Sequence, residues 1–324
     1  MQARQIARRK RKELGQEPPR GYTLRDAWAL WKNVKRGRIV SYQDERRRME
    51  RCIIGPLGGR QIDEITAPLV IQTVKSIERA GHQATLKRVL MRTREVMDLA
   101  VCAGYIHHNP VDRVSRVFAA PIVKPMPSVH WKELPRVMEI VKSAPKRTQL
   151  LFAWACLSLL RPIETVKVRW DWIDGDVLII PATEMKKSRE HRLPLLPLML
   201  YVLQTAKSES PHPKSPFIWA GRVSGRHVSE QTLAKFFHGT DLKGRLVAHG
   251  IRSIGRSWMA DHDAPFEVAE ACLSHVSGSS ASRAYQRSDY LTQRRALMAA
   301  WCAYVSDCAR EVGFLASIFK TDST

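Results

Sequence analysis

The side chains in this chain that could do chemistry are of four polar types, and they occur in a fixed order along its second half. In chain order they are Arg161, Lys186, His249, Arg252, His275 and Tyr285. His249 and Arg252 are three residues apart at the start of a predicted helix, so both project toward the helix N-terminus, where anions are favoured. Guanidinium groups can clamp phosphate oxygens with paired hydrogen bonds, and a tyrosine phenol can serve as a nucleophile. The set therefore predicts a site that binds an anion and attacks it.

Other common chemistries lack their motifs. The sequence has no Walker A, GxGxxG or HExxH motif, which leaves nucleotide-driven and zinc-protease chemistry without local support. The six cysteines form no CxxC pair and have no histidine spacing suited to zinc, so we expect reduced structural thiols in a cytosol. The N-terminus has no apolar signal segment, and the longest apolar run, 150–160, is far shorter than the ~20 residues of a membrane span. We expect a cytoplasmic protein without a metal or cofactor.

The elements that must position these side chains form a predicted second domain, residues 128–310. A helical pattern ends directly at Arg161, and Lys186 lies between two predicted strands. Three short antiparallel strands with an Asp174-Gly175 turn are expected at the edge of a helical domain. The expected strands cover 170–173, 177–180 and 189–195, and the expected helices cover 131–143, 147–160, a segment from about 196, 249–259, 266–273 and 290–308.

A predicted helical domain, residues 22–117, precedes this one. Its first helix starts at Thr23, with apolar residues at helical spacing; a second runs from Thr66 to Gly81, and a third covers about 85–103. Three prolines make 118–127 a linker. Residues 1–21 are read as a basic arm or solvated tail, and 311–324 as a C-terminal tail.

The charge of the chain points to a polyanionic partner. Its 324 residues include 53 Lys and Arg against 31 Asp and Glu, a net charge of +22. With 44% hydrophobic residues, the chain can bury a core in each of two domains. We expect a globular protein that handles nucleic acid, with basic residues on the outward face of the helix over 85–103 contacting DNA. These residues are Lys87, Arg88, Arg92 and Arg94.

Four segments carry a resemblance to a known family. They read SLLRPIETVKVRW (158–170), EMKKSREHRLPL (184–195), AHGIRS (248–253) and LSHVSGSSASRAYQRSDYL (273–291). In this order and spacing the chain resembles the tyrosine recombinase, or phage integrase, family over about residues 22–310, and in particular the integrases of satellite phages and genomic islands. The resemblance implies a helical core-DNA-binding domain followed by a mixed α+β catalytic domain, a fold that is mainly α with a small antiparallel β-sheet.

The resemblance also implies a role for each side chain. Tyr285 would be the nucleophile, and Arg161 and Arg252 would clamp the non-bridging oxygens of the scissile phosphate. His249 would donate to the same phosphate or assist removal of the phenolic proton. Lys186 would protonate the departing 5′-oxygen, a contribution typically worth ~10² to 10⁴ in rate.

His275 would complete the pocket with a hydrogen bond to the phosphate. The family's chemistry implies a 3′-phosphotyrosyl intermediate, a Holliday junction and a tetramer in synapsis on double-stranded DNA attachment sites, without metal or ATP. We expect a monomer without DNA, a nucleoid-associated protein of a prokaryotic host that integrates and excises a mobile element, and a possible excisionase or host DNA-bending factor. The rival functions are a non-catalytic DNA-binding protein and a type IB topoisomerase-like enzyme or telomere resolvase.

Several positions have competing interpretations. Lys187 is the alternative to Lys186, and Tyr290, on the following helix, is the alternative to Tyr285; the Met-Lys alignment and the ten-residue step from His275 favour the first of each pair. Each of the other side chains, taken alone, has a structural interpretation: a helix C-terminal cap for Arg161, a polar residue near a helix start for His249 and a core histidine for His275.

The sequence departs from the family in three places. Leu159-Leu160 stands where Thr-Gly or Gly-Leu is common, Pro162 follows the first arginine, and Ser274 replaces the usual Gly of the Leu-Gly-His motif. We expect these changes to alter how tightly Arg161 and His275 are held, although both side chains remain.

The last residues show apolar side chains at helical spacing on a segment too short to be stable alone. We slightly favour docking of this tail on a neighbouring subunit over folding back on its own domain. The side chains are Val312, Leu315, Ile318 and Phe319.

Overall fold

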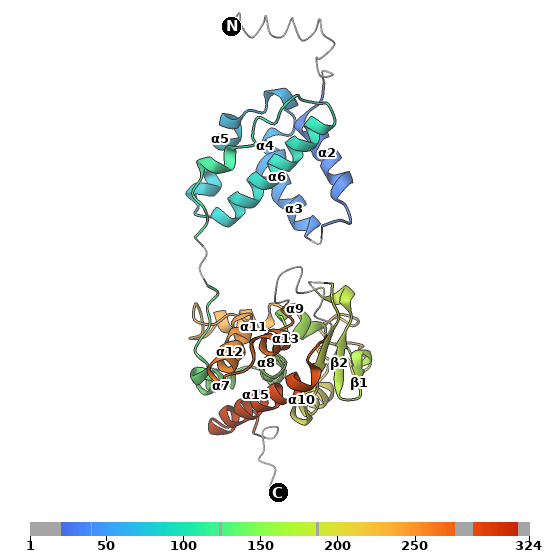
Figure 1. The fold of residues 1–324 in the computed structure, drawn as a ribbon, viewed down its shortest axis with the longest axis vertical. Coiled ribbons are helices and arrows are strands. Elements are labelled where there is room, and N and C mark those ends of the chain that lie inside the picture. Colours follow the sequence, from blue (N-terminus) through green and yellow to red (C-terminus); the bar gives the residue numbers. More distant parts are fainter. Residues whose placement is uncertain (1–20, 40, 123–124, 186–187, 276–287, 317–324) are drawn as a thin grey trace, which may run out of the picture. The chain divides into compact units, whose positions relative to one another are not determined.

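The computed structural model describes residues 21–39, 41–122, 125–185, 188–275 and 288–316. The chain divides into two compact units between residues 124 and 125, inside the predicted linker (Figure 1). Each unit has its own hydrophobic core. The predicted fold class, mainly α with a small antiparallel sheet, is confirmed.

The first unit is mainly helical. Its α-helices are α2 (Leu24–Lys35), α3 (Tyr42–Met49), α4 (Gly55–Leu57), α5 (Ala67–Arg79) and α6 (Gln83–Cys102), with a π-helix at Glu50–Ile54 and 3-10 turns at Ile62–Glu64 and Val114–Val117.

Helix α2 begins at a capping box, in agreement with the predicted start at Thr23. The Thr23 hydroxyl accepts a hydrogen bond from the N–H of Asp26, and the Asp26 carboxylate accepts one from the N–H of Thr23 at 2.7 Å. The buried face of α2 consists of the predicted apolar stripe, and its Trp28 and Trp31 rings stack with centroids 4.6 Å apart. This face packs against α6 and anchors the core of the unit.

The helices over 42–57 were not expected from the hydrophobic pattern. Of the residues of α3, only Glu45 and Met49 are buried. The Glu45 carboxylate forms ion pairs with Arg48 at 2.7 Å and with Arg92 of α6 at 3.3 Å. Because the buried face of α3 combines the charged Glu45 with few apolar residues, periodicity did not detect this helix.

The second unit combines helices with one sheet. Its α-helices are α7 (Leu134–Val141), α8 (Lys146–Ser158), α9 (Pro162–Lys167), α10 (Pro197–Ser208), α11 (Thr232–His238), α12 (Gly250–Asp261), α13 (Phe266–Cys272) and α15 (Leu291–Glu311). Its 3-10 turns are Trp131–Glu133, Trp170–Trp172 and Ala182–Glu184, and its strands are β1 (Ile173–Asp174), β2 (Val177–Ile180) and β3 (His191–Pro194).

Helix α8 is the central element of this unit. Every residue from Leu150 to Ser158 is buried, so the helix is enclosed on all sides and shows no amphipathic pattern. Helices α9 to α12 and α15 pack against it (Figure 1). The indole N–H of Trp301 in α15 donates a hydrogen bond to the carbonyl of Cys156 at 2.7 Å. Helix α8 ends at Ser158, shortly before Arg161, so this buried helix helps to fix the position of that arginine.

The sheet has the predicted order β1-β2-β3, with antiparallel neighbours. Gly175, with φ +56°, occupies the tight turn between β1 and β2. The expectation of a strand over 170–172 is wrong, because these residues form a 3-10 turn. The N–H of Trp170 donates to the carbonyl of Pro216 at 3.1 Å, so a tertiary contact overrides the strand preference of the aromatic residues.

The described part of the C-terminal tail packs on its own unit. Phe314 is fully buried, and its ring meets Phe152 edge-on with centroids 6.0 Å apart. The Lys142 ammonium donates to the carbonyl of Val312 at 2.8 Å, and Leu315 also lies against this core. For these residues the slight preference for docking on a neighbouring subunit is therefore wrong. Ile318 and Phe319 lie outside the described residues.

Among the described residues, no helix combines the length and apolar character needed to cross a membrane.

Candidate active site

Four of the six predicted site residues lie within the described part of the chain. Arg161 follows the end of α8, His249 and Arg252 lie at the start of α12, and His275 follows the end of α13. Lys186 and Tyr285 lie outside the described residues.

Arg161 is the N-cap residue of α9, and Glu164 fixes it at two points. The Glu164 carboxylate accepts the backbone N–H of Arg161 at 3.0 Å and its Nη1–H at 2.8 Å. A second guanidinium nitrogen, Nη2, donates to the carbonyl of Ser274 at 3.0 Å. The carboxylate is buried, so this pairing both orients the arginine and compensates the buried negative charge. The role of α8 C-terminal cap belongs to Leu159, and Arg161 faces the α13 end instead.

Arg252 is buried between the ends of two helices. Its Nη1 donates to the carbonyl of Leu159, and its Nη2 donates to the carbonyl of Leu273 and contacts Nε2 of His275 at 3.0 Å. Burial, together with the positive charge of Arg161, lowers the pKa of Arg252 to about 10, so the side chain stays cationic at neutral pH. Within the described residues its Nε has no hydrogen-bond partner.

The turn after α13 brings two carbonyls to the two arginines. Ser274 has a left-handed backbone with φ 52°, its N–H donates to Ala271, and the N–H of His275 donates to Glu270 at 2.9 Å. These bonds form a Schellman motif, which turns the carbonyls of Leu273 and Ser274 toward the pocket.

Two residues that depart from the family pattern have a left-handed backbone, and each lies shortly before a site residue. Leu159, with φ 52°, ends α8, and Ser274, also with φ 52°, ends α13. Left-handed conformations are most easily adopted by glycine, which is the usual residue of the motif at position 274 and stands at position 159 in the Gly-Leu form of the pair. Strain of this kind persists where surrounding contacts fix the backbone, and here the carbonyls of both residues bind the arginines.

His275 is held from both sides of its ring. Its Nδ1 lies 2.8 Å from a Glu270 oxygen, and the other Glu270 oxygen accepts Nε–H of Arg256 at 2.8 Å. Burial lowers the pKa of His275, and Arg252 acts in the same direction, whereas Glu270 opposes them. Burial of Glu270 favours its protonated form, but the hydrogen bonds from Arg256 and His275 outweigh this and lower the pKa of Glu270.

His249 is the N-cap residue of α12 and is partly buried. The adjoining Gly250 makes close contact with the end of the linker, because a Cβ at this position would lie 2.4 Å from the carbonyl oxygen of Pro127. The Ser128 hydroxyl also donates to the carbonyl of Gly250 at 2.9 Å. These contacts fix the start of the helix that carries His249 and Arg252.

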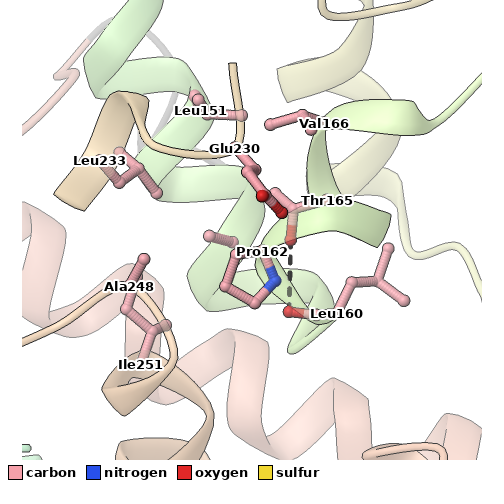
Figure 2. A pocket seen from close by; sticks show the side chains of 10 residues that line it. Leu151, Leu160, Pro162, Thr165, Val166, Glu230, Leu233, Ala248 and Ile251 are labelled. Atoms are coloured by element: carbon pink, nitrogen blue, oxygen red, sulfur yellow. Dashed lines mark hydrogen bonds between the residues drawn. The ribbon is translucent and has the colours of Figure 1, made fainter. Parts of the chain in front are cut away.

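A small cavity lies where α8, α9, α11 and α12 meet (Figure 2). Its volume is about 10 Å³, close to the smallest space that holds one water. Leu160 and Pro162, on either side of Arg161, line one side, and Ala248 and Ile251, beside the α12 site residues, line another.

Sequence reasoning missed several side chains around this pocket. Glu164 and Glu270 are two of them; a third is His191 on β3, which is buried. Burial lowers the pKa of His191 well below its usual range, and the charge of Arg294 adds to this effect. Arg294 of α15 is buried as well, and its Nη1 donates to the carbonyl of Asp289 at 3.3 Å. The sequence offered two signals for these side chains: the three-residue spacing between Arg161 and Glu164, and the place of His191 in the segment 184–195 that carries the resemblance.

The predicted DNA-binding residues of α6 differ in their surroundings. Lys87, Arg88 and Arg94 are exposed, and Arg94 forms an ion pair with Asp112 at 2.8 Å.

Arg92 departs from the expected outward orientation. Only 11% of its side chain is exposed, and its guanidinium forms ion pairs with Glu45 and Glu95 and lies 5.1 Å from the centroid of Trp31. The expectation that Arg92 points outward is therefore wrong, since this arginine joins α6 to α3 and α2.

Comparisons with known proteins agree with this architecture. Residues 128–291 match the family described as phage integrase, and residues 27–117 match the phage integrase central domain. The prophage integrase IntA of Escherichia coli (strain K12) is 35% identical over 282 residues, covering 85% of this chain and 68% of the relative. The putative protein IntB of the same strain is 26% identical over 286 residues, covering 81% and 71%.

Solved structures share the fold at low sequence identity. A lambda integrase tetramer bound to a Holliday junction has a TM-score of 0.65 at 16% identity, covering 82% of this chain and 78% of the other. A lambda integrase dimer bound to a COC′ core site has a TM-score of 0.62 at 17% identity, covering 83% and 96%. The Tn1549 transposon integrase in complex with circular intermediate DNA has a TM-score of 0.58 at 13% identity, covering 86% and 99%.

Proposed function

Because this chain belongs to the phage integrase family and is a tyrosine-type site-specific recombinase, we propose that the pocket around Arg161 and Arg252 cleaves and rejoins DNA strands through a 3′-phosphotyrosyl intermediate on Tyr285. The observation that carries this proposal is the convergence of two guanidiniums and His275 at the ends of α8 and α13 and the start of α12. Glu164 pairs with Arg161, whereas Arg252 makes no ion pair within the described residues, and the two arginines repel each other, so a phosphate bound beside them would be stabilised.

In the proposed reaction, Arg161 and Arg252 hold the scissile phosphate and stabilise the charge that builds on its oxygens. The phenolic oxygen of Tyr285 attacks phosphorus, forming the phosphotyrosyl bond and breaking the bond to the 5′-oxygen. Lys186 gives a proton to that 5′-oxygen, and His249 takes the phenolic proton or hydrogen-bonds the phosphate. The reverse attack by a 5′-hydroxyl restores a phosphodiester, so bond energy is conserved.

Both units are proposed to bind the same duplex at an attachment site. The exposed Lys87, Arg88 and Arg94 on α6 would contact phosphates, which position a protein on DNA without reading sequence. Assembly of four copies around a Holliday junction is supported by the lambda integrase tetramer with the same fold. The protein would be a monomer without DNA and nucleoid-associated in its host, and would use an excisionase or a host DNA-bending factor to integrate and excise its element.

A two-site recombination assay tests this function. The sites are taken from the junctions of the mobile element that encodes the chain, and Holliday junctions are counted on native gels. The wild-type chain should form them, and Arg161→Ala and Arg252→Ala should each lower the rate by about 10²- to 10³-fold at similar DNA affinity. Relaxation of supercoiled DNA without any junction between two sites would favour a topoisomerase-like enzyme. Site binding without cleavage would favour a DNA-binding protein.

A further inference from the structure

Four charged or polar groups form an unbroken series of contacts at the edge of the pocket. Arg256 donates to one oxygen of Glu270 at 2.8 Å, and the other oxygen lies 2.8 Å from Nδ1 of His275. On the far side of the ring, Nε2 of His275 lies 3.0 Å from Nη2 of Arg252. The series begins and ends on α12 and passes through α13 and its terminal turn.

From this arrangement we propose that Glu270 is a positioning residue of the recombinase, which fixes the ring of His275 and sets which of its nitrogens carries the proton. The proposal rests on the function proposed above. An ionised carboxylate only accepts hydrogen bonds, so Nδ1 of His275 must be the donor toward Glu270. A guanidinium only donates, so in the neutral ring Nε2 presents its lone pair to Arg252.

Two features separate this role from a simple connection between α12 and α13. The backbone carbonyl of Glu270 accepts the N–H of His275 at 2.9 Å, so the same residue holds both the backbone and the ring of His275. The Glu270 side chain is 16% exposed against 41% for His275, so the carboxylate is the more buried partner and part of the ring stays accessible. An ion pair with Arg256 alone would need only one of the two carboxylate oxygens.

This arrangement has a consequence for phosphate binding. In the neutral ring Nε2 cannot donate to a phosphate oxygen, and it becomes a donor only when the ring takes up a proton from solvent. The charged groups that face His275 are Glu270 from α13, Arg252 from α12 and Arg161 from the start of α9, with Arg256 behind Glu270. Of these, Glu270 alone favours the protonated ring, since it raises the pKa of His275 while burial and both arginines lower it.

The first test compares cleavage by Glu270→Gln with cleavage by Glu267→Gln, a matched loss of an exposed carboxylate on the same helix. Single-turnover cleavage of a nicked site should fall about 10- to 100-fold in Glu270→Gln and stay unchanged in Glu267→Gln. Since the pKa of His275 falls when the Glu270 charge is removed, the alkaline loss of cleavage should begin at lower pH in Glu270→Gln.

A double-mutant cycle shows whether Glu270 acts through His275. If it does, adding Glu270→Gln to His275→Ala should change the cleavage rate by less than about 3-fold. Full additivity of the two effects would overturn the proposal and indicate a general structural role.

A measurement on the protein without DNA does not depend on cleavage. The ¹⁵N shifts of the His275 ring, assigned by their loss in His275→Ala, should report an Nδ1–H tautomer in the wild-type chain and a mixture in Glu270→Gln. An Nε2–H tautomer in the wild-type chain would overturn the proposal even if cleavage proceeds.

The outcomes for the two proposals are distinguishable. If the wild-type chain forms no covalent complex with any cognate site, the proposed function and the role of Glu270 both fall. If the wild-type chain cleaves and Glu270→Gln matches Glu267→Gln at every pH, only the role of Glu270 falls.

Discussion

Replacing Ser274 by glycine should stabilise the second unit without harming the site. Ser274 has φ 52° at the end of α13, in the left-handed region that side chains with a Cβ adopt at a cost. Its carbonyl holds Arg161, and the neighbouring N–H groups close the Schellman motif. Glycine can adopt the same backbone without the strain, so these contacts should persist.

The expected gain follows from two opposing effects. The left-handed conformation costs a non-glycine residue roughly 1–2 kcal/mol, and glycine loses about 0.5–1 kcal/mol more in chain entropy on folding. The difference gives a gain of about 0.5–1 kcal/mol in the free energy of unfolding for Ser274→Gly. The matched control is Ser274→Ala, which keeps a Cβ and should gain nothing.

The assay is a urea titration of the full chain, followed by hydrogen exchange on peptides from α8 and α15, which report the second unit alone. Ser274→Gly should shift the transition to higher urea, and its cleavage rate should equal that of the wild-type chain. If Ser274→Gly unfolds at the same urea concentration as Ser274→Ala, or at a lower one, the assignment of strain at this turn is refuted.

Other predictions concern packing and charge. Gly250→Ala should destabilise the second unit by about 1–3 kcal/mol in the same titration, because a Cβ would lie 2.4 Å from the carbonyl oxygen of Pro127; an unchanged transition would contradict this close contact. Arg92→Met should destabilise the first unit by about 3 kcal/mol in thermal unfolding, since it leaves the buried Glu45 without one of its cations, and a change below about 1 kcal/mol would contradict the role assigned to this ion pair. Arg88→Met should leave stability unchanged and reduce the log–log salt slope of DNA binding by about 0.9, and an unchanged slope would exclude a phosphate contact.

The elements that the sequence predicts best are those whose own residues form a clear pattern. The stripe of α2 with its Thr23 cap, the buried run of α8 and the turn at Gly175 all appear where the pattern places them. The ordered motifs also predicted that Arg161, His249 and Arg252 belong to one site in the second unit. This prediction came from the family resemblance, because local periodicity carries no information on contacts between distant segments.

The features that escaped prediction depend on contacts between distant segments. Helix α3 is held by Glu45 through Arg92, so neither the helix nor the burial of that arginine could be inferred from either segment alone. In the sequence, Glu270 looks like an ordinary exposed helix residue. Its contact with Nδ1 of His275 depends on the turn after α13, which places the ring beside the Glu270 carboxylate. His191 stands between the charged residues Glu190 and Arg192, a setting that does not indicate burial of its imidazole beside arginines.

The central claim, that Tyr285 attacks the scissile phosphate, is tested most directly by trapping the covalent intermediate on a nicked attachment site and mapping the modified peptide by mass spectrometry. A DNA adduct should form on Tyr285 of the wild-type chain, disappear in Tyr285→Phe and persist in Tyr290→Phe. An adduct on Tyr290, or one that survives Tyr285→Phe, would contradict the claim.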